Sequence, residues 1–426
     1  MTHLHGAKLF RDPVHDTINW KDEGELGRLV CTLIDQPAFQ RLRFIRQLGL
    51  ASLVFAGAEH SRFVHSIGVA HIARRMLARI EPNADFALRA QVIGAALLHD
   101  IGHGPFSHVL ERVFGFRHEA LSRRIVLDPS FGVHQVLRTV DAQLPAQIAD
   151  MIMGQGPARY AQIVSSQLDA DRFDYLLRDV TMTGVTVGRF DLERLLVLLR
   201  ADEDGLMVDH RGWEAVEGYL IARYHMYRLV YFHRTVRAAE VMLERLFHRA
   251  KSVLSPDDPS LDADGAIAQL LRGEEICPHR WLRFSEYDAW AQIDRWCDHG
   301  DRILSLLAQG LLQRKLFKAI ERQILNEQDA IKELALLEAI DEGLSVDERS
   351  LFAMDEASHA TYQPYVAGDK GFGKPIRIVD RRGRISLIEH VSPVVHTLGQ
   401  TATRLRRWYA HPIIFDKVRA LSALDN

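Results

Sequence analysis

Apolar side chains recur at every third or fourth position through most of this chain, and this spacing limits the fold more than any other feature of the sequence. Residues 85–99, DFALRAQVIGAALLH, show it clearly, because apolar residues stand at i, i+3 and i+4 and the Ala and Leu content favours helix. Further segments with this spacing are 27–48, 66–80, 161–179, 213–249 and 300–341. We therefore expect a mostly α-helical protein.

Strand signals are few and lie near the two ends of the sequence. Alternation of apolar and polar residues over 374–390 predicts a small β-hairpin that turns at Arg382 and Gly383. A shorter β segment is expected over 8–20, where Pro13 opposes a helix. These elements are additions to a helical fold rather than its framework.

A boundary between two regions is predicted at 252–265, a stretch rich in Pro, Asp and Ser. It separates an N-terminal region, 1–250, from a C-terminal helical region, 251–426, that carries the hairpin. Within the C-terminal region, 321–356 is acidic, whereas 370–419 holds eleven Lys or Arg against three Asp or Glu. We expect the acidic run to form a solvated helix face, with docking to the basic stretch as the alternative.

Composition excludes several classes of protein. The chain holds 53 Lys or Arg and 56 Asp or Glu, a formal net charge of −3, which argues against a protein whose whole surface binds nucleic acid. Its three cysteines (Cys31, Cys277 and Cys297) are too few and too scattered for a disulfide framework or a cysteine metal cage. The sequence lacks an 18-residue apolar run and a signal-peptide core at its start. We therefore expect a cytoplasmic protein that does not bind membranes.

Histidine is unevenly distributed. Seven of the 21 histidines lie within 60–118, where an even distribution would place about three. His99 and Asp100 end the helix predicted at 85–99, which alone fits a histidine placed against a helix dipole. However, His65 directly precedes the helix expected over 66–80, and Asp171 lies on the helix expected over 161–179. Imidazole and carboxylate ligands together suit a borderline or hard divalent cation, and a helical bundle can supply four of them.

Six motifs resemble the HD-domain phosphohydrolases, in particular the bacterial form of the branch that contains dGTPases and sterile-alpha-motif/HD deoxynucleoside triphosphate triphosphohydrolases. The motifs are DPVHDTI (12–18), QPAFQRLRFIRQLG (36–49), FAGAEHSRFVHSIGV (55–69), LLHDIGHGPFSH (97–108), HE (118–119) and LDADRFDYLLRD (168–179). They follow the family's order and spacing over roughly 7–250. The resemblance implies an HD-domain helical bundle over 1–250 that acts as a metal-dependent phosphohydrolase.

The resemblance also implies roles for individual residues. The metal ligands would be His65, His99, Asp100 and Asp171. The ion is left open between Mn, Mg, Fe, Zn and Ni, because two histidines and two aspartates suit several divalent metals. His103, His108 and His118 would line the catalytic pocket, with His108 as general acid, since histidine titrates near neutral pH and can protonate a leaving alkoxide. For His60 and His71 we expect ordinary structural roles.

Substrate-binding residues are implied in the same way. Arg62 and Arg172 would contact phosphates, Tyr175 and Asp179 would hold the sugar, and Gln47 would contact its 3′-hydroxyl. A further phosphate-binding arginine is expected after residue 225. Arg237 is preferred over Arg228 and Arg234, because it stands four positions after His233 on one helix face, and His233 is expected to bind substrate with it.

A regulatory nucleotide site is a further implication of the resemblance. Lys8, Asp35, Gln40 and Arg43 match residues that bind an activating guanine nucleotide between subunits, which predicts a homo-oligomer, a dimer or a tetramer. The simpler interpretation is that these charged side chains form solvated ion pairs.

Three functions remain open from the sequence. The favoured one is hydrolysis of (deoxy)nucleoside triphosphates to nucleoside and inorganic triphosphate. The alternative keeps the site but acts on single-stranded nucleic acid or nucleotide monophosphates, and the basic stretch 370–419 would bind the strand. It contains Trp408 and Tyr409 beside Arg404, Arg406 and Arg407. The third is a regulatory nucleotide-binding protein whose hydrolysis is vestigial.

Overall fold

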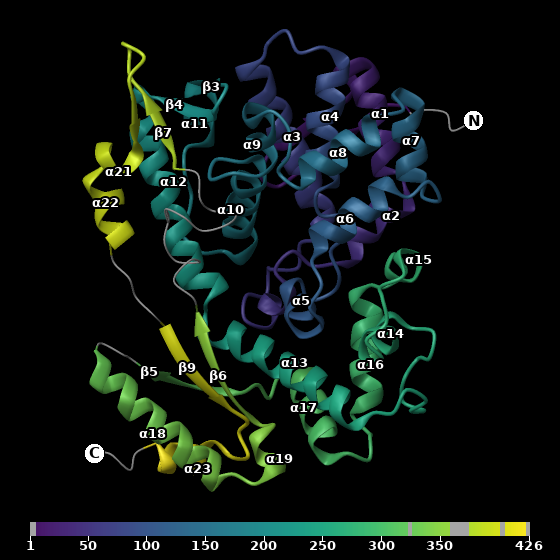
Figure 1. Ribbon diagram of the computed structural model, residues 1–426, viewed down its shortest axis with the longest axis vertical. Coiled ribbons are helices and arrows are strands. Elements are labelled where there is room, and N and C mark those ends of the chain that lie inside the picture. Colours follow the sequence, from purple (N-terminus) through teal and green to yellow (C-terminus); the bar gives the residue numbers. More distant parts are fainter. Residues whose placement is uncertain (1–5, 323–325, 358–374, 401–404, 423–426) are drawn as a thin grey trace.

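The N-terminal part of the chain folds into a bundle of helices around one apolar core (Figure 1). The computed structural model describes residues 6–322, 326–357, 375–400 and 405–422. The bundle helices are α1 (Gly24–Ile34), α2 (Pro37–Gln40), α3 (Arg62–Ile80), α4 (Phe86–Leu98), α5 (His108–Phe114), α6 (His118–Leu127), α7 (Gly132–Val140), α8 (Leu144–Ile152), α9 (Ala158–Val164), α10 (Ala170–Thr183), α11 (Leu192–Leu198) and α12 (Trp213–Met226). Short turns join them at η1 (Lys21–Glu23), η2 (Arg41–Phe44), η3 (Gly49–Leu53), η4 (His210–Gly212) and the π-turn η5 (Tyr227–Tyr231).

A second apolar core lies below the bundle and is built mainly by the C-terminal part of the chain, with Leu50, Leu110 and Leu121 contributed by the N-terminal part. Its helices are α13 (Arg234–Val253), α14 (Ala266–Leu271), α15 (Pro278–Trp281), α16 (Glu286–Trp296), α17 (Arg302–Leu312), α18 (Glu327–Gly343), α19 (Val346–Arg349) and α23 (Phe415–Leu421). A three-stranded antiparallel sheet belongs to it, with the order β5 (Lys318–Arg322), β9 (Leu405–Ala410) and β6 (Phe352–Ala357). The prediction of a mostly α-helical fold is confirmed.

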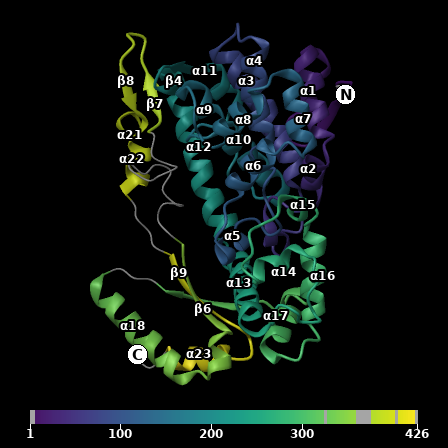
Figure 2. The same ribbon diagram turned by 45° about the vertical axis from the view of Figure 1, so that its right-hand side comes forward.

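Two further sheets decorate the bundle. The strands β1 (Leu9–Asp12) and β2 (Asp16–Asn19) form a hairpin within the 8–20 segment, for which the sequence predicted a single β segment. The hairpin expected over 374–390 is also present, as β7 (Arg377–Val379) and β8 (Ile385–Leu387), and Gly383 turns it at φ 77°. It extends β3 (Leu199–Asp202) and β4 (Gly205–Asp209), since β7 pairs with β4 in parallel. The chain then forms α21 (Ile388–Val391) and α22 (Pro393–Gln400) beside α12 (Figure 2).

Four of the long helices predicted from periodicity are interrupted. The 27–48 segment stops at Ile34, because Gln36 precedes a proline and takes an extended conformation. A loop after Val164 divides 161–179, and 213–249 breaks at η5 before α13 begins. The 300–341 segment contains the strand β5. Apolar periodicity continues across each break, so the periodicity does not show where a helix ends.

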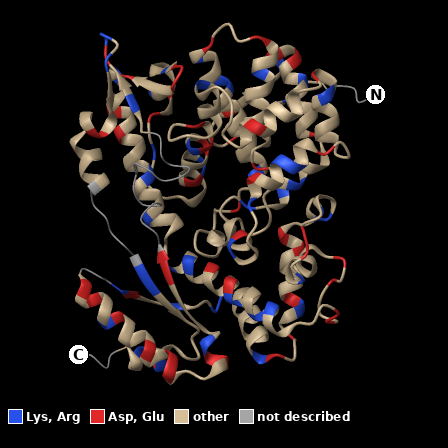
Figure 3. Cartoon of the chain, viewed as in Figure 1, with Lys and Arg blue, Asp and Glu red and all other residues tan. Residues whose placement is uncertain are grey.

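Opposite charges bring the acidic and basic C-terminal segments together (Figure 3). Arg406 on β9 binds Glu333 at 2.8 Å and Glu356 at 3.0 Å, and Lys417 binds Glu348 at 2.7 Å. Much of α18 faces solvent, as predicted. The ion pairs themselves correspond to the alternative, in which the acidic run docks to the basic stretch. None of the described helices has the length and apolar character needed to cross a membrane.

The two aromatic side chains cited in favour of nucleic-acid binding do not lie at the surface. Trp408 and Tyr409 are both fully buried in the second core, where bases cannot stack on them. Arg407 donates to the main-chain oxygen of Phe232 at 2.6 Å, and Arg404 lies outside the described residues. The expectation that this stretch offers exposed aromatic side chains to a single strand was therefore wrong, because β9 is the central strand of its sheet.

Candidate active site

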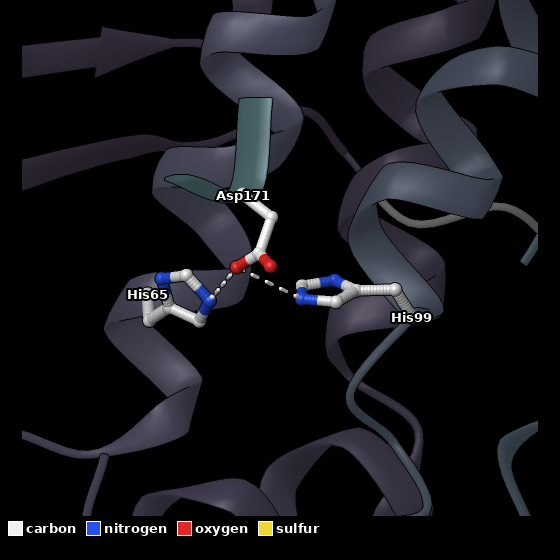
Figure 4. Close-up of side chains that lie close together, drawn as sticks. All are labelled: His65, His99 and Asp171. Carbon is white, nitrogen blue, oxygen red and sulfur yellow. Dashed lines mark ion pairs between the residues drawn. The ribbon is translucent and has the colours of Figure 1, made fainter. Parts of the chain in front are cut away.

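Three helices bring a cluster of histidine and carboxylate side chains to one point (Figure 4). His65 lies in the first turn of α3, His99 directly follows α4, and Asp171 lies in the first turn of α10. His65 Nε2 stands 3.0 Å from Asp171 Oδ1, and His99 Nε2 stands 3.6 Å from the same oxygen. Asp169 starts α10 here by capping it, since its side chain accepts the main-chain N–H of Arg172.

Asp100 completes the predicted ligand set. Its Oδ1 lies 3.3 Å from His99 Nε2, and its Oδ2 lies 3.8 Å from His65 Nε2. The buried Arg62 donates to Oδ2 at 2.5 Å and to the Ser107 hydroxyl at 2.8 Å. The structure therefore places all four proposed ligands together, with one predicted phosphate-binding arginine beside them.

The cluster has the donor set of a divalent metal site. Among the described residues, the Nε2 atoms of His65 and His99 are buried without a hydrogen-bond partner, although both face carboxylates. Burial lowers the pKa of His65, but the nearby carboxylates of Asp171 and Asp174, the latter hydrogen-bonded to Nδ1, outweigh burial and raise that pKa to about 10. Positive charge is thus favoured at this point, and two imidazoles with two carboxylates fit a divalent cation there.

The three remaining predicted histidines form a second group around Glu111. The rings of His103 and His118 stack with centroids 3.6 Å apart, and His118 Nδ1 donates to Glu111 at 2.8 Å. His108 Nδ1 lies 3.5 Å from the same carboxylate, and the His108 side chain is 61% exposed. Burial raises the pKa of Glu111, but hydrogen bonds from His108 and His118 prevail and lower it to about 2. Sequence reasoning missed Glu111, although its position three residues after His108 indicated the contact.

A cavity of about 970 Å³ opens over both groups. It is lined by these predicted substrate-binding residues: Gln47, Arg62, Arg172, Tyr175, Asp179 and Arg237. Gln47 Oε1 is buried and has no hydrogen-bond partner within the described part of the chain. His233 is not one of the described lining residues, because it caps α13 by accepting the N–H of Thr235.

Two side chains hold Asp179 in this wall. His60 Nε2 lies 2.7 Å from Asp179 Oδ1, and the Tyr231 hydroxyl donates to Oδ2 at 2.8 Å. His60, for which we expected an ordinary structural role, therefore orients a carboxylate that lines the cavity. The spacing of the sequence gave no indication of this contact, because 119 residues separate the pair.

The C-terminal sheet supplies the far wall of the cavity. Asp355 on β6 accepts from Arg237 Nε at 3.0 Å and from Nη2 at 2.6 Å, and Glu240 also pairs with Arg237. Asp355 and Glu356 both line the cavity. The sequence did not predict that residues beyond 250 reach the site.

The four residues of the predicted regulatory site lie together outside the cavity. Lys8 Nζ binds Asp35 at 2.5 Å, and Arg43 Nε donates to Gln40 Oε1 at 2.8 Å. Gln40 in turn donates to the main-chain oxygen of Ile34, next to Asp35. None of the four is among the described residues that line the cavity.

Comparison with known proteins identifies the family. The HD domain model matches residues 62–179, which contain all four proposed metal ligands, and the HD associated region model matches residues 190–258. The YwfO protein of Bacillus subtilis is 36% identical over 418 residues, which cover 97% of this chain and 94% of that protein. A phosphohydrolase from Bacteroides thetaiotaomicron is 30% identical, with a TM-score of 0.77 over 95% of this chain and all of that chain. The chain belongs to the HD-domain phosphohydrolase family.

Relatives with a named activity share part of this HD-domain phosphohydrolase. The deoxynucleoside triphosphate triphosphohydrolase SAMHD1 of Gallus gallus is 31% identical over 285 residues, which cover 57% of this chain. The Xenopus laevis protein of the same name is 29% identical over 309 residues. The chain spans about half the length of these two relatives, 45% and 47%.

Proposed function

We propose that this HD-domain phosphohydrolase hydrolyses deoxynucleoside triphosphates, or nucleoside triphosphates, to the nucleoside and inorganic triphosphate. The observation that carries the proposal is the cavity itself, because three of the four proposed metal ligands, His99, Asp100 and Asp171, line it together with arginines and other polar side chains. Its volume of about 970 Å³ is at the upper end of the range for small-molecule sites, which suits a nucleotide. The named activity of the SAMHD1 relatives supports the same substrate class.

The reaction requires charge neutralisation and a proton for the leaving group. When bound by the four ligands, a divalent ion supplies Lewis acidity toward the reacting phosphate. Arg62 and Arg172 line the same cavity and hold the negative charge of the phosphates. Water attacks the α-phosphorus and releases one of its protons to solvent, the bond to the 5′-oxygen breaks, and that oxygen takes up a proton. His108 supplies this proton, with Glu111 holding the group of three histidines in place.

The sugar end of the substrate is bound by the cavity residues Asp179, Gln47 and Tyr175. Asp179 is fixed by His60 and Tyr231, so its position does not depend on the substrate. Gln47 presents a buried oxygen without a partner among the described residues, and a sugar hydroxyl can donate to it. Tyr175 lines the same wall.

Product analysis tests this proposal. The metal-free protein is supplied in turn with Mn²⁺, Mg²⁺, Fe²⁺, Zn²⁺ or Ni²⁺ and incubated with dNTPs, NTPs, nucleotide monophosphates and short oligonucleotides. We expect equimolar nucleoside and inorganic triphosphate from at least one nucleoside triphosphate. Release of phosphate or pyrophosphate, or of mononucleotides from oligomers, would overturn the proposal in favour of a different phosphohydrolase activity.

For regulation, we propose that a guanine nucleotide binds at Lys8, Asp35, Gln40 and Arg43. The proximity of the four side chains and their separation from the cavity support it. GTP is then expected to increase the mass measured by sedimentation and the rate of hydrolysis of other dNTPs, and Arg43→Ala to remove both effects. Identical mass and rate with and without GTP or dGTP would exclude this regulation.

A further inference from the structure

A fully buried carboxylate, Asp174, lies directly behind the proposed metal ligand His65. Asp174 Oδ2 accepts from His65 Nδ1 at 2.8 Å, and both side chains are inaccessible to solvent. The other ring nitrogen, Nε2, faces Asp171 and His99. A hydrogen bond at Nδ1 fixes the tautomer in which Nε2 offers its lone pair, and this is the tautomer that a metal ligand needs.

Asp174 is itself fixed by two other side chains. Arg178 donates to it from Nε at 2.8 Å and from Nη2 at 2.9 Å, and His15 Nε2 lies 2.7 Å from Oδ1. Arg178 Nη1 also donates to Asp12 at 2.8 Å. All of these side chains are at least nine-tenths buried, so the network is held without competition from water.

The network begins in the turn of the β1–β2 hairpin. Asp12 Oδ1 accepts the main-chain N–H groups of Val14 at 2.8 Å and His15 at 3.0 Å, and these bonds shape the turn. The turn directs His15 at Asp174, which lies 159 residues later in the sequence. The hairpin precedes residue 62, where the match to the HD domain begins.

Gly68 shows how closely the two helices enclose this network. A Cβ built at Gly68 on α3 would lie 1.9 Å from Asp174 Oδ1 and 2.5 Å from Arg178 Nη2, both on α10. A methyl group at this position must therefore displace the carboxylate or the guanidinium. The helices can approach with Asp174 in place only when residue 68 lacks a side chain.

We propose that the hairpin turn is part of the metal centre, because His15 and Asp12, acting through Asp174 and Arg178, position His65 as a ligand. None of these four residues is a proposed ligand, so each is a positioning residue. This inference rests on the proposed metal ligands.

Metal affinity measures the positioning directly. The full-length protein is stripped of metal and titrated with Mn²⁺ alone, and its dissociation constant is compared with that of variants. Asp174→Asn should weaken Mn²⁺ binding about 10- to 100-fold, because an amide can donate to His65 Nδ1 and favour the wrong tautomer. Asp301→Asn is the matched control, since Asp301 forms a bidentate pair with Arg249 in the second core, and its affinity should equal wild type.

Two further pairs of variants separate positioning from a loss of folding. His15→Leu should weaken Mn²⁺ binding, whereas His15→Gln should bind almost as wild type, because its amide can donate where Nε2 does. Gly68→Ala should also weaken binding. Gly218→Ala should not, since a Cβ at this helical glycine meets no atom of the described residues within 4 Å. Far-UV circular dichroism and thermal melting verify that each variant is folded.

The outcomes distinguish this inference from the proposal on which it rests. If His65→Ala binds Mn²⁺ as well as wild type, the ligand assignment is wrong. If His65→Ala loses Mn²⁺ but folded Asp174→Asn, His15→Leu and Gly68→Ala all retain wild-type affinity, the ligands are right and the hairpin has no positioning role. A second measurement uses zinc-loaded protein with ¹⁵N-labelled histidine. We expect the Nδ1–H resonance of His65 in the wild type and its loss in Asp174→Asn only.

Discussion

The two walls of the cavity hold their charged side chains in different ways. The metal wall is the cluster of His65, His99, Asp100 and Asp171, of which all but the buried His65 line the cavity. The outer wall consists of His108, Arg112, Arg237, Glu244 and Asp355. On the metal wall each side chain is held by several partners, and the exposed fraction is 30% at Asp171 and 12% or less at the others. On the outer wall, Arg112 pairs with Glu244 and Glu240, Arg237 pairs with Asp355 and Glu240, and the exposed fraction is 44% at Arg112 and 61% at His108.

This difference indicates what each wall does when substrate arrives. Buried charges with several partners cannot rearrange without leaving one of them unpaired, which costs several kcal/mol. Exposed ion pairs such as Arg112–Glu244 are weaker, at about 0–1 kcal/mol each, so a phosphate can replace the carboxylate there at little cost. We therefore expect the metal wall to be preorganised and the exposed part of the outer wall to exchange partners when substrate binds.

The largest expected effect comes from removing half of the metal wall. The double change His99→Ala and Asp100→Ala leaves two of four ligands, so bound metal and hydrolysis should both fall to background while the protein stays folded. Elemental analysis with circular dichroism measures this. A double variant that keeps full metal content would show that the cluster is not the metal site.

On the outer wall, His108→Ala should affect chemistry without affecting binding. A general acid acts mainly in the transition state, so kcat should fall by about 10²–10⁴ while KM and metal content stay near wild type. The exposed position of His108 makes a packing defect a poor explanation for such a loss. An equal loss of substrate affinity would instead make His108 a phosphate-binding residue.

Opposite changes in KM are expected from the two members of one outer-wall pair. Arg237→Ala removes a proposed phosphate contact and should raise KM about 10-fold, whereas Asp355→Asn frees Arg237 from its competitor and should lower KM by a smaller factor. Steady-state kinetics with one dNTP measures both. If Asp355→Asn also raises KM, then Asp355 orients Arg237 and does not compete with substrate.

The smallest effect concerns a neutral histidine behind the metal wall. Burial, together with the charge of Arg74, lowers the pKa of His71 to about 3. The unfolded chain therefore takes up a proton below about pH 6.5 that the folded protein does not, and stability falls as pH falls from 6.5 toward 3. His71→Asn keeps an acceptor for Arg74 but cannot titrate.

Urea unfolding at pH 7.5 and pH 5.0 measures this difference. Between these values the wild-type free energy of unfolding should decrease by about 2 kcal/mol more than that of His71→Asn. Equal pH dependence of the two proteins would show that His71 accepts a proton in the folded state.

The sequence predicted those parts of the site that neighbouring residues define. His99 and Asp100 are adjacent, and Asp171 lies at the start of a helix whose stripe is evident, so their motifs could be recognised together. The contacts of His15 with Asp174 and of Arg237 with Asp355 span 159 and 118 residues. Each depends on how separate elements pack, which periodicity within one segment does not describe.

In the fold as well, the sequence predicted what neighbouring residues define and missed what depends on contacts between elements. The stripe of 85–99 is continuous and corresponds to α4, and the segment 66–80 lies within α3. Helix ends were missed because they depend on caps such as Asp169 and His233, which interrupt a chain whose apolar spacing continues. The strands β3 and β4 were missed as well, because strands of four and five residues are too short for a periodic pattern to show.

The parallel pairing of β4 with β7 has a consequence for how this protein can be divided. Val208 stands opposite Ile378, 170 positions later, and Ile376 and Val395 complete the first core after most of the second has been built. During synthesis the N-terminal bundle therefore waits for its last strand until nearly the whole chain has left the ribosome. A chain cut at residue 250 would keep every proposed metal ligand, yet β4 would become a free edge on which other copies could pair and aggregate.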